Sequence, residues 1–244
     1  MGFLAQRNIL AVEEMDRPDC DPERLERTYA QFGLVNAVVA GWRRLYRRDL
    51  LPRFSPTGST TLLDIGCGGG DVARSLARWA ARDGLELRIM ATDPDPRALA
   101  FALAQPSLPG LEFRPALSSE LVAEGFTADL VISNHVLHHL PGPALQALMA
   151  DSEALATRFA LHNDLQRSPV AYALFSAGTL PFFHRSFIRA DGLTSLRRSY
   201  TTAELRQLVR PGWRVRPGAL FRNLVSYDAS GYDAHRSAGH DRGA

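Results

Sequence analysis

The stretch LLDIGCGGGDVA, from Leu62 to Ala73, joins a short apolar run to an amphipathic segment through glycines at alternate positions. The apolar run predicts a buried strand, and Asp71–Ala81 has the apolar spacing of a helix. Glycines let a backbone turn tightly and pass close to a ligand, and the helix that follows offers free N–H groups. The stretch therefore predicts a strand, a ligand-binding turn and a helix in succession.

The chain that follows repeats this alternation of short apolar runs and amphipathic segments. The predicted strands are Thr61–Ile65, Leu87–Thr92, Leu111–Arg114, Asp129–Ser133 and Arg158–His162. Alternating strands and helices are typical of a parallel sheet with helices on both faces. Further on, Thr201 and Glu204 form the capping box of a helix, and two strands around Pro217 and Gly218 predict a hairpin that closes the sheet.

Three regions are predicted along the chain. Residues 1–55 form an N-terminal helical cap, whose helices are expected to break near Gly33. Residues 56–228 form the α/β domain, with a lid insertion at about 166–200 between the fifth and sixth strands. The polar and aperiodic residues 229–244 are expected to be a disordered tail.

The composition excludes several kinds of protein. All 28 basic residues are arginine, so the chain has neither a Schiff-base lysine nor the lysine of a P-loop. The formal net charge of +2 gives no global field that would attract nucleic acid or a membrane. Cys20 and Cys67 make no disulfide framework, and no apolar run has the length of a membrane span or of a secretory signal. We therefore expect a soluble, cytoplasmic protein.

The acids around the glycine turn narrow the class of ligand. A dinucleotide fingerprint reads G-x-G-x-x-G, and here Asp71 stands at the position of its third glycine. Asp64 and Asp71 flank the turn, which disfavours a pyrophosphate and suits a positively charged ligand such as S-adenosylmethionine, with its ammonium and sulfonium groups. Asp93 ends a predicted strand 23 residues after Gly70, near the offset at which a carboxylate accepts from both ribose hydroxyls.

Three segments, LLDIGCGGGDVA, ATDPDP and ADLVISNHVLHHL, resemble motifs of the class I, Rossmann-like S-adenosylmethionine-dependent methyltransferases. The resemblance extends from about Thr61 to Tyr227 and implies a seven-stranded, mostly parallel sheet whose last strand is antiparallel. It implies S-adenosyl-L-methionine as the cofactor, with its methionine part held by Asp64 and the glycine turn and its ribose held by Asp93. The cofactor-binding residues expected on this basis are Asp64, Gly66, Cys67, Gly68, Gly70, Asp93, Pro94, Ser118, Asn134 and Tyr29.

The N-terminal segment from Arg27 to Pro52 is similar to that of the quinone-biosynthesis methyltransferases. In that group an aromatic–asparagine–tryptophan/arginine pattern forms a cover over the cofactor. The matching positions in this chain are Tyr29, Asn36 and Trp42.

One departure from the family pattern concerns adenine. After the third strand the family often has an aspartate whose carboxylate accepts from the adenine amino group. This chain has Leu117, Ser118 and Ser119 there. A hydroxyl or backbone contact of Ser118 or Ser119 is the expected substitute.

Methyl transfer to a hydroxyl needs alignment of the oxygen with the methyl group and a side chain that takes the proton. His162 ends the fifth predicted strand, beside the expected methyl position, and is the first candidate for this base. His138 and His139, in LHHL after the fourth strand, are further candidates, with packing and helix capping as the alternative. No metal is expected; the alternative is a site formed by His135, His138, His139 and Asp164.

The segment between the fifth and sixth predicted strands is rich in aromatic residues. These side chains would either form the roof of an acceptor pocket or pack a lid against the core. The residues expected to bind the acceptor are Tyr172, Phe175, Phe182, Phe183 and His184. The leading interpretation is O-methylation of a small aromatic or polyketide-like acceptor with a histidine base.

Other functions stay open. C-methylation of a quinol-type ring is a close variant, and binding of S-adenosylmethionine as an effector would need no turnover. RNA methylation would use Arg43, Arg44, Arg47, Arg48 and Arg53, but such a cluster on an amphipathic helix is usually a solvated face, so no nucleic-acid partner is expected. A nicotinamide-dependent dehydrogenase would share the sheet. The sequence determines neither the acceptor nor the oligomeric state, and a homodimer is left open.

Overall fold

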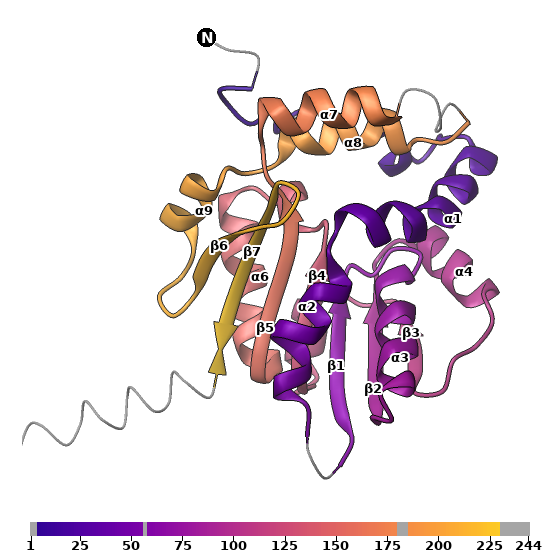
Figure 1. Ribbon diagram of the computed structural model, residues 1–244, viewed down its shortest axis with the longest axis vertical. Coiled ribbons are helices and arrows are strands. Elements are labelled where there is room, and N and C mark those ends of the chain that lie inside the picture. The colour runs from indigo at the N-terminus through magenta and orange to yellow at the C-terminus, as the bar shows by residue number, and fades with distance from the viewer. Residues whose placement is uncertain (1–3, 56–57, 180–184, 230–244) are drawn as a thin grey trace, which may run out of the picture.

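The computed structural model describes residues 4–55, 58–179 and 185–229, and its strands form one seven-stranded sheet in the order β3-β2-β1-β4-β5-β7-β6 (Figure 1). The strands are β1 (Thr60–Ile65), β2 (Leu87–Thr92), β3 (Leu111–Arg114), β4 (Ala128–Asn134), β5 (Ala156–Leu165), β6 (Arg214–Gly218) and β7 (Arg222–Asp228). Strands β1 to β5 are parallel, and β7 pairs antiparallel with both β5 and β6. The predicted Rossmann-like, mostly parallel sheet with an antiparallel last strand is confirmed.

Helices cover both faces of this sheet, as predicted. They are η1 (Glu14–Asp16), α1 (Pro22–Val39), α2 (Trp42–Leu45), η2 (Tyr46–Leu50), η3 (Leu51–Arg53), α3 (Asp71–Arg82), α4 (Pro96–Ala104), α5 (Ser118–Ala123), η4 (Leu137–His139), α6 (Gly142–Leu155), α7 (Pro169–Thr179), α8 (Ile188–Arg198) and α9 (Thr202–Leu208). Leu62 of β1 shares one apolar layer with Leu76 of α3, whereas Leu63 shares the opposite layer with Met149 of α6. Because successive residues of a strand point to opposite faces, both layers are needed to bury β1.

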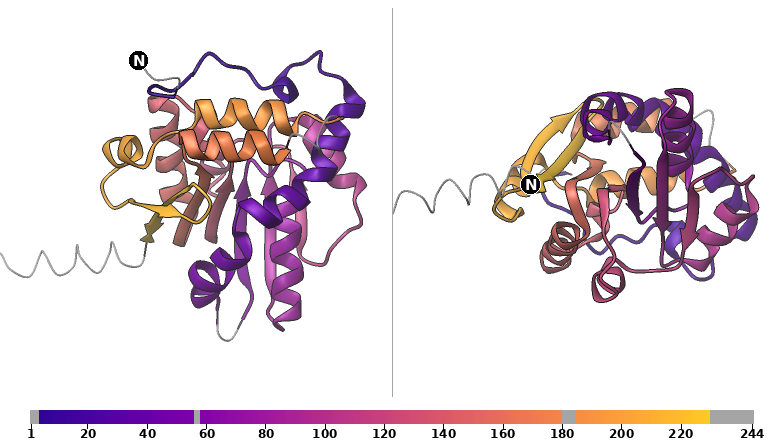
Figure 2. Two further views of the ribbon diagram at one scale, coloured as in Figure 1. Left: turned by 45° about the horizontal axis from the view of Figure 1, so that its top comes forward. Right: turned by 90° about the horizontal axis from the view of Figure 1, so that it is seen from below.

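Two segments that are distant in the sequence cover the edge formed by the carboxyl ends of the parallel strands. Helices α7 and α8, from the predicted insertion after β5, lie side by side across this edge (Figures 1 and 2). The N-terminal segment is attached to α8, where the backbone N–H groups of Glu14 and Met15 donate to the carboxylate of Asp191 at 2.7 and 3.0 Å. Residues near the N-terminus therefore reach the same edge as the ends of β4 and β5.

The N-terminal helices do not break where we expected. Helix α1 continues through Gly33, and the break follows at Gly41, whose φ is +68°. A glycine within a helix costs only about 1 kcal/mol relative to alanine, so Gly33 can be accommodated. A left-handed residue ends a helix, and glycine adopts that conformation without strain.

The terminal hairpin is confirmed, but its turn lies further along the chain than Pro217 and Gly218. Both residues belong to β6, and the turn comprises residues 219–221, in which Leu220 and Phe221 have φ values of 52° and 57°. Strand β6 is at the edge of the sheet. A proline is tolerated there because its missing N–H can face away from the ladder.

Among the residues that the structure describes, no helix is both long and apolar enough to cross a bilayer. The tail predicted for residues 229–244 lies outside the described residues from position 230 onward.

Candidate active site

The glycine turn between β1 and α3 is left-handed at all three alternate glycines. Gly66, Gly68 and Gly70 have φ values of +69°, +54° and +77°. The N–H groups of Gly66 and Cys67 donate to the carbonyl of Thr92 at 2.8 and 2.9 Å, which ties the turn to the end of β2. The geometry explains why the sequence has glycine at these positions.

Gly70 should be the most sensitive position of this turn. A Cβ atom there would lie 2.5 Å from Cε1 of Phe113, whereas at Gly84, with a similar φ of +72°, no atom lies within 4 Å. We expect Gly84→Ala to lower the free energy of unfolding by about 1 kcal/mol through backbone strain alone, and Gly70→Ala by about 2–4 kcal/mol through strain and overpacking. Urea unfolding measures both. Equal losses would contradict the close approach of Phe113.

Asp64, near the end of β1, has a buried carboxylate without a partner. Its side chain is only 1% exposed, and neither carboxylate oxygen has a hydrogen-bond partner among the described residues. Burial, and then the negative charges of Asp71 and Asp93, raise the pKa of Asp64 well above its usual range. An isolated buried carboxylate is unfavourable, so this side chain requires a positively charged or hydrogen-bond-donating ligand.

Asp93 is held at the opposite side of the same turn. Its carboxylate accepts from the N–H of Gly68 at 2.8 Å and from the N–H of Asp95 at 2.9 Å. Burial raises the pKa of Asp93. Each carboxylate oxygen keeps a further lone pair, so Asp93 can accept from a vicinal diol. The adjacent Pro94 is exposed.

Helix α1 of the N-terminal cap is attached directly to the turn. The side-chain amide of Asn36 donates to Asp71 Oδ2 at 2.9 Å. Tyr29 is buried against the ring of Phe101, at a centroid distance of 5.4 Å, and a Cβ atom on Gly69 would lie 3.4 Å from the Tyr29 Cβ. Two of the three N-terminal positions named from the family pattern, Tyr29 and Asn36, therefore lie at the turn, whereas Trp42 is buried in the apolar layer that contains Leu62.

The other predicted cofactor residues have protein partners in this structure. The Ser118 hydroxyl donates to Asp151 Oδ2 at 2.6 Å, and Asn134 Oδ1 accepts from Arg222 at 2.9 Å. Cys67 is buried, and its thiol lies 3.6 Å from the carbonyl of Gly68. A contact of Ser118 with adenine stays a prediction.

His162 is not placed where a base could reach an acceptor, which corrects our first expectation. Its side chain is fully buried, its Nδ1 lies 2.7 Å from Ser133 Oγ, and its ring stacks on Trp213 at 5.2 Å. Burial lowers the pKa of His162 to about 4. The side chain shares the face of β5 with Ala160, toward α6 and α9, so the strand's alternation directs it into the core.

His138 instead lies between two carboxylates at the covered edge. Its Nδ1–H donates to Asp164 Oδ1 at 2.7 Å, and its Nε2 is 3.3 Å from Glu13 Oε1, close enough for an ion pair but not aligned for a hydrogen bond. Although burial opposes it, these charges raise the pKa of His138 to about 9, and the imidazolium lowers that of Glu13 to about 2. Glu13 also accepts from Ser195 of α8 at 2.7 Å.

His139 and His135 are connected to His138 and its two carboxylates. His139 lies 3.5 Å from Asp16, and burial followed by the charge of His138 lowers its pKa to about 4. His135 has a left-handed φ of 62°, and its Nε2 accepts from Arg222 at 2.9 Å. Burial and the Arg222 guanidinium lower the pKa of His135 well below its usual range. His135 is thus a neutral ring whose second nitrogen is a donor.

Two sets of these side chains have ligand atoms within 4.8 Å of one another: Glu13 with His138 and His139, and His135 with His138 and Asp164. The second set is the metal alternative named from the sequence, without His139. The buried guanidinium of Arg222 lies beside it and repels a cation. The geometry is that of a hydrogen-bonded network centred on His138.

Two of the five residues predicted to bind the acceptor lie in the part of the chain that the structure describes. Tyr172 and Phe175 are half-buried on α7. Phe175 packs on α8, because a Cβ atom on Gly192 would lie 2.3 Å from its ring. Phe182, Phe183 and His184 lie outside the described residues.

Glu13 and Arg222 were not among the site residues predicted from the sequence. Arg222 is only 1% exposed and donates to Asn134 and Asn163 at the ends of β4 and β5, each at 2.9 Å. A single arginine in a terminal strand and a single glutamate in an irregular N-terminal segment carry no periodic signal. Only their distant partners distinguish them.

Comparison with known proteins identifies the domain. Residues 62–157 match the family model of a methyltransferase domain. The fold resembles human N-acetylserotonin methyltransferase in complex with S-adenosylmethionine, with a TM-score of 0.60 and 15% identity over 85% of this chain and 56% of that chain. It also resembles magnesium protoporphyrin IX methyltransferase of Synechocystis PCC 6803, with a TM-score of 0.51 and 16% identity over 90% of this chain and 86% of that chain. Residues 62–157 therefore form part of a methyltransferase domain, and the fold of the chain is the one found in these two solved structures.

Two sequence relatives of this methyltransferase domain bear the same enzyme name. The ubiquinone biosynthesis O-methyltransferase of Methylobacterium sp. is 36% identical over 124 residues, which are 50% of this chain and 47% of the relative. The enzyme of that description from Caulobacter vibrioides is 33% identical over 107 residues, 40% of each chain. The chain thus spans about half the length, or less, of these two relatives. The recognition of a class I S-adenosylmethionine-dependent methyltransferase is confirmed, and the dehydrogenase alternative loses its support.

Proposed function

We propose that this methyltransferase domain transfers the methyl group of S-adenosylmethionine to a hydroxyl oxygen of a small aromatic or polyketide-like acceptor. The observation that carries the proposal is the partnerless carboxylate of Asp64 beside the left-handed glycine turn. Buried and unpaired, it suits the ammonium group of the cofactor's methionine part. Asp93, across the turn, suits the ribose hydroxyls.

When bound, S-adenosylmethionine supplies a methyl group that its sulfonium already activates. The chain's own contribution is to orient the ligands, exclude water and take a proton. Asp64 would orient the amino-acid part, beside a glycine turn whose N–H groups at Gly66, Cys67, Gly68 and Gly70 are bound to protein acceptors. Helices α7 and α8 and the N-terminal segment cover the edge at which the acceptor would lie (Figure 2).

We favour His138 as the proton acceptor because it lies at the covered edge. Its side chain is nearly as buried as that of His162, so an acceptor hydroxyl would have to replace Glu13 at Nε2. Asp164 orients its ring through Nδ1 and leaves Nε2 facing Glu13. Since its pKa is about 9 with both carboxylates in place, His138 must lose a proton before it can take one from an acceptor hydroxyl. A positioned base of this kind contributes about 10²–10⁴-fold in rate.

Oxygen is the favoured methyl acceptor for two reasons. A hydroxyl requires a base, which this site offers in His138. The two relatives described above are named as O-methyltransferases. The aromatic side chains of Tyr172 and Phe175 on α7 support a ring-containing acceptor.

The test combines binding with turnover. Calorimetric titration with S-adenosylmethionine, S-adenosylhomocysteine and NAD is expected to show binding of the two sulfur ligands and none of NAD. Incubation with catechols, resorcinols and quinols and methyl-labelled cofactor should then give a methyl ether, which NMR distinguishes from a C-methyl product. A C-methyl product would overturn O-methylation, and binding of NAD alone would overturn the whole proposal.

The pH dependence of the reaction tests the role of Glu13. For the wild type, kcat/KM is expected to rise with pH up to about 9, as His138 loses its proton. Glu13→Gln removes one of two carboxylates that stabilise the imidazolium, so the rise should move to lower pH. The control is Glu14→Gln, an exposed neighbour. An unchanged midpoint in Glu13→Gln would contradict the assignment of His138.

The free energy of unfolding should also depend on pH through the pair of His138 and Glu13, and the pKa shifts give the direction of the change. The folded pKa of His138 is raised from 6.5 to about 9, so its contribution is complete below pH 6.5 and is lost as pH rises through 9. The folded pKa of Glu13 is lowered from 4.5 to about 2, so its contribution is complete above pH 4.5 and is lost as pH falls toward 2. The ion pair is therefore expected to stabilise the fold most between about pH 4.5 and 6.5.

A further inference from the structure

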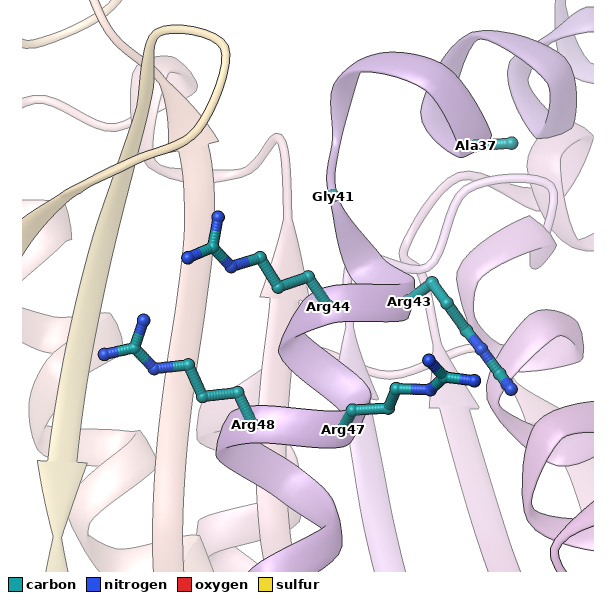
Figure 3. A pocket seen from close by; sticks show the side chains of 6 residues that line it. All are labelled: Ala37, Gly41, Arg43, Arg44, Arg47 and Arg48. Atoms are coloured by element: carbon teal, nitrogen blue, oxygen red, sulfur yellow. The ribbon is translucent and has the colours of Figure 1, made fainter.

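An arginine-lined hollow lies on the helical stretch α2–η2, which the methyl-transfer proposal does not use. Its volume is about 580 Å³, and it is lined by Ala37, Gly41, Arg43, Arg44, Arg47 and Arg48. Figure 3 shows Arg44 and Arg48 extending to one side of the helix and Arg43 and Arg47 to the other. The spacing places two arginine pairs at i and i+4.

These four arginines have no ion pair with any described residue. Ion pairs with carboxylates are made elsewhere by Arg17, Arg27, Arg53, Arg88, Arg97, Arg114, Arg158, Arg167, Arg198, Arg210 and Arg216. The acid of the same helical stretch, Asp49, is bound by Arg216 at 2.7 Å. Like charges at i and i+4 destabilise a helix, so this arrangement favours an anion, which the described residues do not supply.

Two buried donors next to the arginines also lack an acceptor. A second hollow of about 350 Å³ shares Ala37 and Arg43 with the first and is lined by Trp42 and Trp79 as well. Arg43 Nη1 and Trp42 Nε1 are both buried without a hydrogen-bond partner among the described residues. Buried polar groups are normally paired, so both donors call for a ligand with acceptor oxygens.

We propose that the two adjoining hollows form a binding site for a phosphate ester, which borders the cofactor turn at Asn36 and Asp71. The phosphate oxygens would be held by Arg43 and Arg47, which extend to the same side of the helix and whose planar guanidinium groups match phosphate geometry bidentately. The organic part would lie in the second hollow along Trp42 and Trp79. Asp71 also lines that hollow, but its carboxylate accepts from Asn36, so the phosphate belongs at the arginine side.

The test measures binding of pyrophosphate and of adenosine diphosphate to the full chain by calorimetry at low and physiological salt. Arg43→Gln/Arg47→Gln is expected to weaken both by about tenfold or more, because two charge-assisted contacts are lost. The matched control is Arg78→Gln/Arg206→Gln, which removes two exposed arginines of α3 and α9 and should change affinity by less than about twofold. S-adenosylmethionine binding should be unchanged in both variants, which separates this site from the proposed methyl transfer.

The source of the phosphate is distinguished by cosedimentation with vesicles. Retention by phosphatidylglycerol but not phosphatidylcholine vesicles, lost in Arg43→Gln/Arg47→Gln, would assign the phosphate to a lipid headgroup. Binding of the soluble probes without retention would assign it to a soluble ester. Equal losses in the control pair, or no binding to any probe, would overturn the site. An RNA oligomer that binds and is not displaced by pyrophosphate would overturn it in favour of a nucleic-acid surface.

Discussion

Asp64→Asn is expected to weaken S-adenosylmethionine binding by about 10- to 100-fold or more while making the ligand-free protein more stable. The loss arises because hydrogen bonds to a charged group contribute about 1.5–3 kcal/mol, and the amide cannot pair with an ammonium. The gain, about 1–2 kcal/mol near neutral pH, arises because a buried carboxylate without a partner is removed. Calorimetry measures the first effect and urea unfolding the second.

The stability gain should itself depend on pH. The folded pKa of Asp64 is raised, so the wild type is relatively stable at acid pH and loses stability as pH rises through that pKa. The difference between variant and wild type should therefore vanish below the ordinary range of a carboxyl group.

Asp129→Asn is the control for Asp64, because Asp129 is paired. Its carboxylate accepts from the backbone and hydroxyl of Thr61 and forms an ion pair with Arg158. This variant should lose stability and keep its affinity for S-adenosylmethionine. If Asp64→Asn bound S-adenosylmethionine with wild-type affinity, or were less stable than the wild type, Asp64 would not be the partner of the ammonium group.

His138→Gln is expected to lower kcat by about 10²–10⁴-fold with little change in S-adenosylmethionine binding. Glutamine keeps a side-chain amide near Asp164 but cannot take a proton. His162→Gln is the matched control. It should lower the free energy of unfolding by about 1–3 kcal/mol, because the hydrogen bond to Ser133 and the stacking on Trp213 are lost, and leave kcat within a few-fold.

The kcat values of His138→Gln and His162→Gln, measured at a temperature where both variants are folded, decide which histidine is the base. A loss of kcat in His162→Gln as large as that in His138→Gln would return the base to His162. A small loss in both would remove the histidine base from the mechanism.

Turns and helix caps that depend on residues close together in the sequence could be predicted. The capping box of Thr201 and Glu204 is present, with the Thr201 N–H donating to Glu204 Oε2 at 2.8 Å. The glycine turn and the position of Asp93 at the end of β2 followed from spacing in the same way. The break at Gly41 instead of Gly33 was not predictable by this means, because glycine marks where a helix can end and only the surrounding packing decides where it does.

The sequence by itself determined the α/β fold, the methyltransferase class and the acids of the turn, since strands, turns and helix caps depend on residues close together in the chain. The tertiary structure alone decided the surroundings of the two histidines, with His162 in the apolar core and His138 between two carboxylates. The face to which His162 points depends on the pairing of β5 and on Trp213, which fills the layer beside it. The charge on His138 depends on Glu13 and Asp164, which are far apart in the sequence. Electrostatic interactions of this kind act through space, so no local pattern records them.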